Sequence, residues 1–156
     1  MATFELPYGR PMTNATIPDT IERTTELPQP VERVWSALTD PAEFGRWFSQ
    51  EAAWDLEPGA PMTMRWDQYG TSVGVIVEVT PTTRFAYRWG SEDRPLEDGQ
   101  STLVTWTLAP ADGGGTTLTV VESGFATLYN GPEQIKDNTG GWQEQFENIT
   151  AYLAGG

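Results

Sequence analysis

The spacing of apolar residues changes along the first third of the chain. Residues 17–27 alternate between apolar and polar positions and are rich in threonine, which predicts a first β-strand. Apolar residues then recur with helical spacing over residues 30–40 and over residues 41–48. Asp40 can cap the second of these segments, and Pro41 suits its first helical position. We therefore expect two short helices after the first strand.

The middle of the chain, residues 53–125, has the pattern of a β-meander. It contains six runs in which apolar and polar positions alternate, and turn residues separate the runs. The glycine-rich stretch at residues 111–115 predicts a tight hairpin turn. Strands that follow one another through short connections pair in antiparallel fashion, so these six runs are expected to form one sheet with the first strand.

The last part of the chain returns to helical spacing, from about Asn130 onwards. The apolar residues that share one face are Trp142, Phe146, Ile149 and Leu153. Gly140 and Gly141 stand directly before Trp142, although each glycine costs about 1 kcal/mol relative to alanine inside a helix. Two interpretations stay open. The glycines let another segment pack closely on the helix backbone, or they form a thin wall at a cavity entrance with Trp142 as its gate.

This order of elements predicts an α+β fold. A curved antiparallel sheet of about six or seven strands would wrap around the long C-terminal helix, and the two short helices would close one end. A chain of 156 residues fits a single domain. We expect residues 17–154 to form that domain, and residues 1–16, which show no periodicity, to form an irregular N-terminal arm.

Composition and charge exclude several classes of function. The chain has no histidine and no cysteine, so the commonest general base, metal ligand and thiol nucleophile are missing. Its net charge of −13 disfavours nucleic acid and anionic membranes as partners. No secretory signal or membrane-spanning run is apparent. We expect a cytoplasmic protein with no metal ion and no cofactor.

Five stretches of the chain resemble sequences of a known family. They read PVERVWSALTDPAEFGRWF, EPGAPMTMRW, VGVIVEVTPTTRFAYRW, GTTLTVVESGF and GGWQEQFENITAYL. In this order they resemble the START-like, or helix-grip (SRPBCC), superfamily, and within it the bacterial domains similar to the activator of Hsp90 ATPase. The resemblance covers about residues 17–154. It implies a cavity between the sheet and the long helix, where different members bind lipids, hormones or polyketides and some act as cyclases.

The inward faces of the expected elements are rich in aromatic residues and methionine. Several tryptophans and tyrosines together suit an apolar pocket with a few polar groups, because each ring needs a partner for its N–H or O–H. Core packing is the competing interpretation for each residue. The predicted pocket residues are Trp47, Met62, Met64, Trp66, Phe85, Tyr87, Trp89, Trp106, Glu122, Trp142 and Phe146.

Glu122 is the sharpest single candidate for chemistry. It shares a strand face with Leu118 and Val120, so it points inward if they do. A buried carboxylate could act as acid, base or hydrogen-bond anchor, with Tyr87 as a weaker catalytic candidate. The alternatives are that the strand reaches solvent before Glu122 or that an arginine pairs with it. The direction of Glu78 stays open, because its neighbours give conflicting patterns.

These observations favour the binding of a small hydrophobic or aromatic molecule between sheet and helix. One alternative is a cyclase-, aromatase- or hydrolase-type enzyme that uses Glu122 and a tyrosine hydroxyl, so whether the chain is an enzyme stays open. A second alternative is a stress- or chaperone-related protein-interaction domain. The Hsp90 activity of the family's namesake depends on a further domain, and no sequence feature supports a protein partner here.

Overall fold

The computed structural model describes residues 19–94, 96 and 99–155, and the expected arm at residues 1–16 lies outside them. The first elements are β1 (Thr20–Leu27), α1 (Val31–Thr39) and α2 (Pro41–Trp47). Six strands follow: β2 (Glu51–Ala53), β3 (Pro61–Trp66), β4 (Gly70–Thr80), β5 (Arg84–Ser91), β6 (Thr102–Pro110) and β7 (Thr116–Ser123). The described chain ends with the long helix α3 (Gly131–Gly155).

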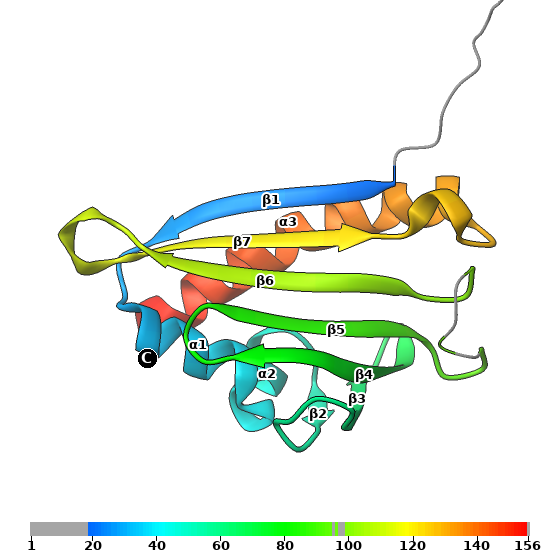
Figure 1. Ribbon diagram of the computed structural model, residues 1–156, viewed down its shortest axis with the longest axis horizontal. Coiled ribbons are helices and arrows are strands. Elements are labelled where there is room, and N and C mark those ends of the chain that lie inside the picture. Colours follow the sequence, from blue (N-terminus) through cyan, green and yellow to red (C-terminus); the bar gives the residue numbers. More distant parts are fainter. Residues whose placement is uncertain (1–18, 95, 97–98, 156) are drawn as a thin grey trace, which may run out of the picture.

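The seven strands form one antiparallel sheet in the order β1-β7-β6-β5-β4-β3-β2. Consecutive strands from β2 to β7 are neighbours, as expected for a meander, and β1 returns beside β7. The helix α3 runs behind the sheet along one face, and α1 and α2 lie near the end of α3 that holds the C-terminus (Figure 1). The predicted α+β helix-grip fold is therefore confirmed.

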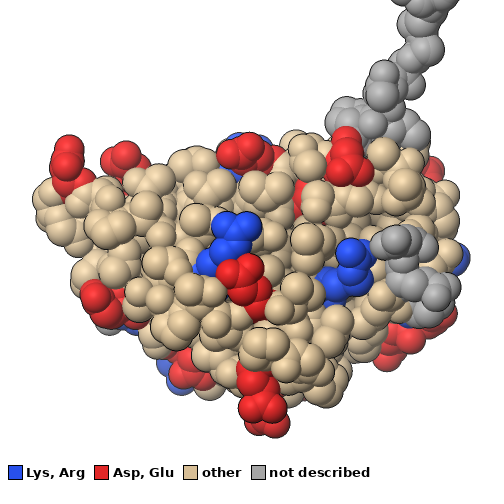
Figure 2. Space-filling model, viewed as in Figure 1, with Lys and Arg blue, Asp and Glu red and all other residues tan. Residues whose placement is uncertain are grey.

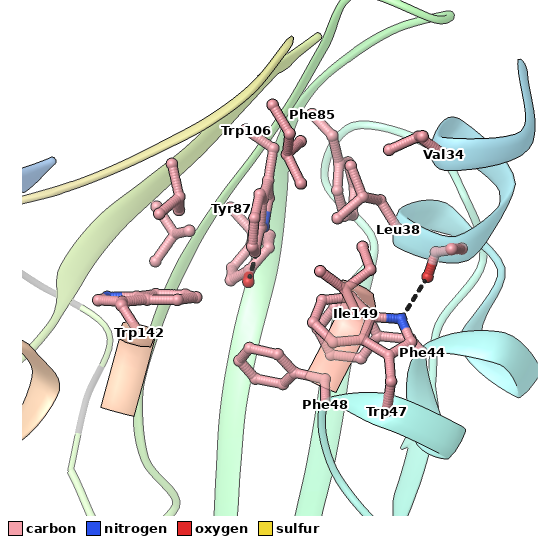
Figure 3. Close-up of a cluster of buried hydrophobic side chains, with 14 of the residues drawn as sticks. Val34, Leu38, Phe44, Trp47, Phe48, Phe85, Tyr87, Trp106, Trp142 and Ile149 are labelled. Carbon is pink, nitrogen blue, oxygen red and sulfur yellow. Dashed lines mark hydrogen bonds between the residues drawn. The ribbon is translucent and has the colours of Figure 1, made fainter. Parts of the chain in front are cut away.

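The core fills the space between the sheet and the helices. Large side chains from β5 and β6 point toward α3 and meet rings from α2, and Figure 3 shows this cluster. The four residues of the predicted α3 stripe, Trp142, Phe146, Ile149 and Leu153, are all buried. The sheet and the helix thus bury each other's apolar face, which stabilises α3 despite its two central glycines.

The two short helices begin as the sequence indicates, with one difference. Asp40 caps α2 by accepting a hydrogen bond from the Ala42 backbone N–H at 3.0 Å, and Pro41 is the first helical residue. Pro30, which suits a first helical position, instead precedes α1 as its cap residue in extended conformation. The missing N–H of proline costs nothing at either place.

Glu43 of α2 ties the three helices together. Its carboxylate accepts hydrogen bonds from Arg33 at 2.7 Å, from Ser36, and from the Tyr152 hydroxyl at 2.7 Å. Partial burial works to raise the pKa of Glu43, but the hydrogen bonds from Ser36, Tyr152 and Arg33 outweigh it. The pKa of Glu43 consequently lies below its ordinary value.

A β-bulge in β4 explains the conflicting pattern around Glu78. The register with β5 shifts between Ile76 and Glu78, so that Val77 has no partner residue and is half exposed. An extra residue reverses the alternation beyond it. Ile76 therefore lies in the core, and Glu78 forms an ion pair with Arg84 at 3.1 Å on the surface.

None of the helices in the described part of the chain is long and apolar enough to cross a membrane.

Candidate ligand-binding site

A wide-mouthed cavity of about 930 Å³ lies between the first half of α3 and one end of the sheet. The turn between β3 and β4, the end of β5, the beginning of β6 and the end of β7 contribute to its walls. The loop that leads into α3 closes another side. A volume of this size falls in the range of small-molecule sites.

Four aromatic rings form one wall of the cavity, and Phe48 is at their centre. Its ring centroid lies 5.6 Å from that of Trp66, 5.8 Å from that of Trp89 and 5.7 Å from that of Trp142. Trp89 and Trp142 also contact each other at 5.8 Å with an angle of 32° between their rings. All four residues line the cavity, so an apolar surface of tilted aromatic rings is available to a ligand.

Glu122 joins this wall to the sheet. The carboxylate accepts hydrogen bonds from Trp142 Nε1 at 2.8 Å, Trp89 Nε1 at 2.9 Å and the Thr102 hydroxyl at 2.5 Å. Asn138 Nδ2 lies 3.0 and 3.1 Å from its two oxygens. Indole N–H groups can only donate, so the carboxylate is the acceptor that holds both tryptophan rings in position. Its partners are these neutral donors rather than an arginine.

The alternation of β7 explains the inward direction of Glu122. Leu118, Val120 and Glu122 are fully buried, and the residues between them are partly exposed. Glu122 pairs with Val104 of β6 on one side and with Ile21 of β1 on the other. It is therefore held inside the sheet, and β7 does not reach solvent before it.

A chain of amide groups continues from Glu122 along α3. Gln134 Nε2 donates to Asn138 Oδ1 at 2.8 Å, and Asn130 Nδ2 donates to Gln134 Oε1 at 3.2 Å. Because the Glu122 carboxylate requires a donor from Asn138, the direction of every amide in the chain is set. The last acceptor, Asn130 Oδ1, is buried without a hydrogen-bond partner. All three amide residues line the cavity.

The two glycines of α3 border the same cavity. A Cβ built on Gly140 or on Gly141 would have no described atom within 4 Å, apart from the helix's own backbone and chain neighbours. Close packing of another segment, one of the two interpretations from the sequence, is therefore wrong. The absence of these side chains instead leaves open space along the cavity.

The structure brings together only part of the predicted pocket set. Trp66, Trp89, Glu122 and Trp142 line the cavity. The other predicted residues lie in the core outside the lining: Trp47, Met62, Met64, Phe85, Tyr87, Trp106 and Phe146. They are all buried, because the centre of the sheet packs directly against α1, α2 and the second half of α3.

Sequence reasoning missed the polar part of the lining. Gln68, Gln100 and Gln145 contribute amides in addition to those of the α3 chain, and Tyr69 and Tyr129 are exposed at the rim. The lining of the cavity is therefore more polar than the apolar pocket that the sequence predicts. One available signal was the spacing of Asn130, Gln134 and Asn138, which places three amides on the helix face that also carries Gly141.

Tyr87 is not placed to act with Glu122 on a bound molecule. Its hydroxyl accepts a hydrogen bond from Trp106 Nε1 at 3.3 Å in the core (Figure 3). Burial raises the pKa of Tyr87 well above its ordinary value, and the nearby charge of Glu122 adds to this effect. Within the described residues, moreover, no group of three or more acidic side chains could hold a metal ion.

Comparisons with known proteins give the family and the fold. The family model "Activator of Hsp90 ATPase homolog 1-like protein" matches residues 28–154. Among solved structures, CalU16 from Micromonospora echinospora is 24% identical with a TM-score of 0.70, and the match covers 86% of this chain and 75% of that one.

Two further solved structures are similar to this chain. DynU16, a protein in the dynemicin biosynthetic locus, is 26% identical with a TM-score of 0.72, and the match covers 88% of this chain but 48% of DynU16. PFC0360w, an HSP90 activator from Plasmodium falciparum, is 23% identical with a TM-score of 0.70, and the match covers 88% and 97%. A search of curated proteins returned no match.

Proposed function

Because the chain belongs to the family of Activator of Hsp90 ATPase homolog 1-like proteins, a family of ligand-binding domains, we propose that it binds a small molecule with an aromatic body. The site is the cavity between the sheet and the first half of α3. The observation that carries this proposal is the wall of Phe48, Trp66, Trp89 and Trp142, which borders a space of about 930 Å³.

The wall is preorganised for this role. Three of its indole N–H groups already have protein acceptors, since Trp89 and Trp142 donate to Glu122 and Trp66 donates to the Phe48 carbonyl at 2.8 Å. A ligand ring can therefore stack on these surfaces without leaving a buried donor unsatisfied. Fixed rings also lower the entropy that binding would otherwise cost.

The amide groups around the wall favour a ligand that also carries polar groups. A ligand with hydroxyl or amide groups could exchange hydrogen bonds with the cavity rim, which an all-hydrocarbon ligand such as an alkane could not. DynU16, which lies in a biosynthetic locus, supports a small-molecule role for this branch of the fold. The proposed ligand is therefore amphipathic, with a flat ring system and several polar substituents.

The proposal is tested by titrating the full chain with a panel of hydroxylated aromatic compounds, following tryptophan fluorescence and binding heat. The matched variants are Gly141→Leu, which places a side chain in the cavity, and Gly155→Leu near the helix end, where a Cβ also meets no described atom within 4 Å. We expect Gly141→Leu to weaken binding at least tenfold and Gly155→Leu to leave it unchanged. Equal effects of both variants, or no binding by the folded wild type, would refute the proposal.

A further inference from the structure

The charged side chains among the described residues that line the cavity are all acidic. Three acidic residues line it: Glu122 at the inner wall, and Asp137 and Glu144 at the exposed mouth. Of the described residues that line it, none is an arginine or a lysine. The outer face of the sheet differs, because charged side chains of both signs are scattered over it (Figure 2). The cavity is thus an electronegative space with aromatic walls.

The two acidic residues at the mouth flank the glycine pair. Asp137, Gly141 and Glu144 follow one another at the i, i+4, i+7 spacing of one helix face. Because Gly140 and Gly141 have no side chains, a ligand can approach the helix backbone between the two carboxylates. About two helical turns, or roughly 10 Å, separate their positions along the helix axis.

A neutral hydrogen-bond acceptor borders the cavity at the start of the same helix. Asn130 borders the cavity, and its Oδ1 atom is buried without a hydrogen-bond partner. The hydrogen bonds that start at Glu122 leave this oxygen as an acceptor, so only a donor can satisfy it. Asn130 stands seven residues, or roughly 10 Å, before Asp137, so its oxygen calls for a separate hydrogen-bond donor. The preference for positive charge comes from the two carboxylates at the mouth.

The arginines and lysine near the cavity are not among its lining residues, although Arg88 donates to the lining residue Ser101 at 3.1 Å. Arg94 lies at the rim, where its guanidinium stacks on the Tyr129 ring at 3.7 Å and donates to Gln100 at 3.1 Å. Lys136 is next to Asp137 in sequence but does not line the cavity. Arg88, Arg94 and Lys136 therefore all lie outside the lining of the cavity.

We infer that the ligand carries a protonated amine beside its aromatic body, an inference that rests on the proposed function. The ring system stacks on the tryptophan wall, and the ammonium group lies at the mouth between Asp137 and Glu144. Aromatic faces attract cations as well, so the wall adds to the preference. Anionic aromatic compounds, such as aryl carboxylates, are disfavoured because they would meet three carboxylates without a paired cation.

The test uses three probes of similar size and different charge: 2-(2-naphthyl)ethylamine, 2-(2-naphthyl)ethanol and 2-naphthylacetate. Calorimetric titration of the full chain at low salt should give the amine at least tenfold higher affinity than the alcohol, with the acetate weakest. The preference should shrink as salt is added, because the mouth is exposed. An alcohol or an acetate that binds as tightly as the amine would overturn the inference while leaving the proposed function intact.

A matched pair of double variants locates the effect. Asp137→Asn with Glu144→Gln should lower the affinity for the amine about fivefold or more and leave the affinity for the alcohol unchanged. Glu133→Gln with Glu147→Gln alters the net charge equally at exposed α3 residues outside the cavity, and it should leave both probes unchanged. Equal losses in both double variants would show attraction by the whole protein's charge and refute the site. If none of the probes binds, the proposed function fails as well.

Discussion

Trp142 of the long helix donates its indole N–H to Glu122 of the last strand at 2.8 Å, and both residues are buried. This contact joins α3 to the sheet at the inner wall of the cavity. It lies one residue after the glycine pair, so the helix is held firmly where its own propensity is lowest. A polar contact between core residues thus helps to shape the ligand site.

The role of Glu122 as an acceptor is tested by Glu122→Gln. The new amide would present N–H donors to a site that already contains two indole N–H groups and the Asn138 amide. We expect the free energy of unfolding to fall by about 1–3 kcal/mol, the cost of leaving buried donors unpaired. Urea denaturation measures it, with the exposed Glu147→Gln as control. A catalytic role without a structural one predicts unchanged stability.

The contact between Asn138 and Glu122 offers a complementary test. Asn138→Asp would bring a second carboxylate within about 3 Å of the first and remove a donor. We expect a loss of about 2–4 kcal/mol at neutral pH, which recovers partly in acid as a proton bridges the two groups. Asn148→Asp, at the same cavity but without a contact to Glu122, is the control and should cost much less. Similar losses of stability in both variants would contradict the contact between Asn138 and Glu122.

Tyr87→Phe distinguishes a core role from a role in the site. The change removes the acceptor of the buried Trp106 N–H, so the free energy of unfolding should fall by about 1–2 kcal/mol. Affinity for an aromatic ligand should not change, since Tyr87 does not line the cavity. Thermal unfolding measures the loss of stability, and calorimetric titration of the same sample measures the affinity. Lost binding at full stability would return Tyr87 to the list of candidate site residues.

Glu43 makes the junction of the three helices sensitive to pH. Its pKa in the folded protein lies below the ordinary value of 4.5, so its contribution to stability is present above that pH and is lost as the pH falls through the folded pKa. Glu43→Gln should therefore cost about 1–3 kcal/mol at neutral pH and progressively less in acid. The free energies of unfolding of the wild type and the variant, measured from pH 7 to pH 3, test this expectation. A difference that does not depend on pH would show that the charge is not needed.

Much of the fold could be predicted from the sequence because the relevant signals are local. The Asp40-Pro41 pair marks the end of one helix and the start of the next, and the alternation of Leu118, Val120 and Glu122 gives the inward face of β7. Glu78 shows where such reasoning ends. A single extra residue in β4 reverses the alternation, and only pairing with β5 reveals it.

The division between core and cavity could not be predicted from these patterns. Trp106 and Trp142 both point inward, yet Trp142 borders the cavity and Trp106 does not. Inward direction depends on the period of one strand or helix, whereas a cavity depends on how far the sheet stands from α3 at each level. The polar lining was not predicted for the same reason, since amides such as Gln134 resemble ordinary surface residues of a helix.

The sequence by itself determined the order of elements, the family and the buried face of most elements, with β4 as the exception. Periodicity and capping act within a few residues, so the chain reveals them directly. Only the tertiary structure decided that Glu122 of β7 meets Trp89 of β5 and both Trp142 and Asn138 of α3. It also decided that Gly141 faces open space rather than a packed neighbour. These contacts depend on distances between elements, which no local pattern encodes.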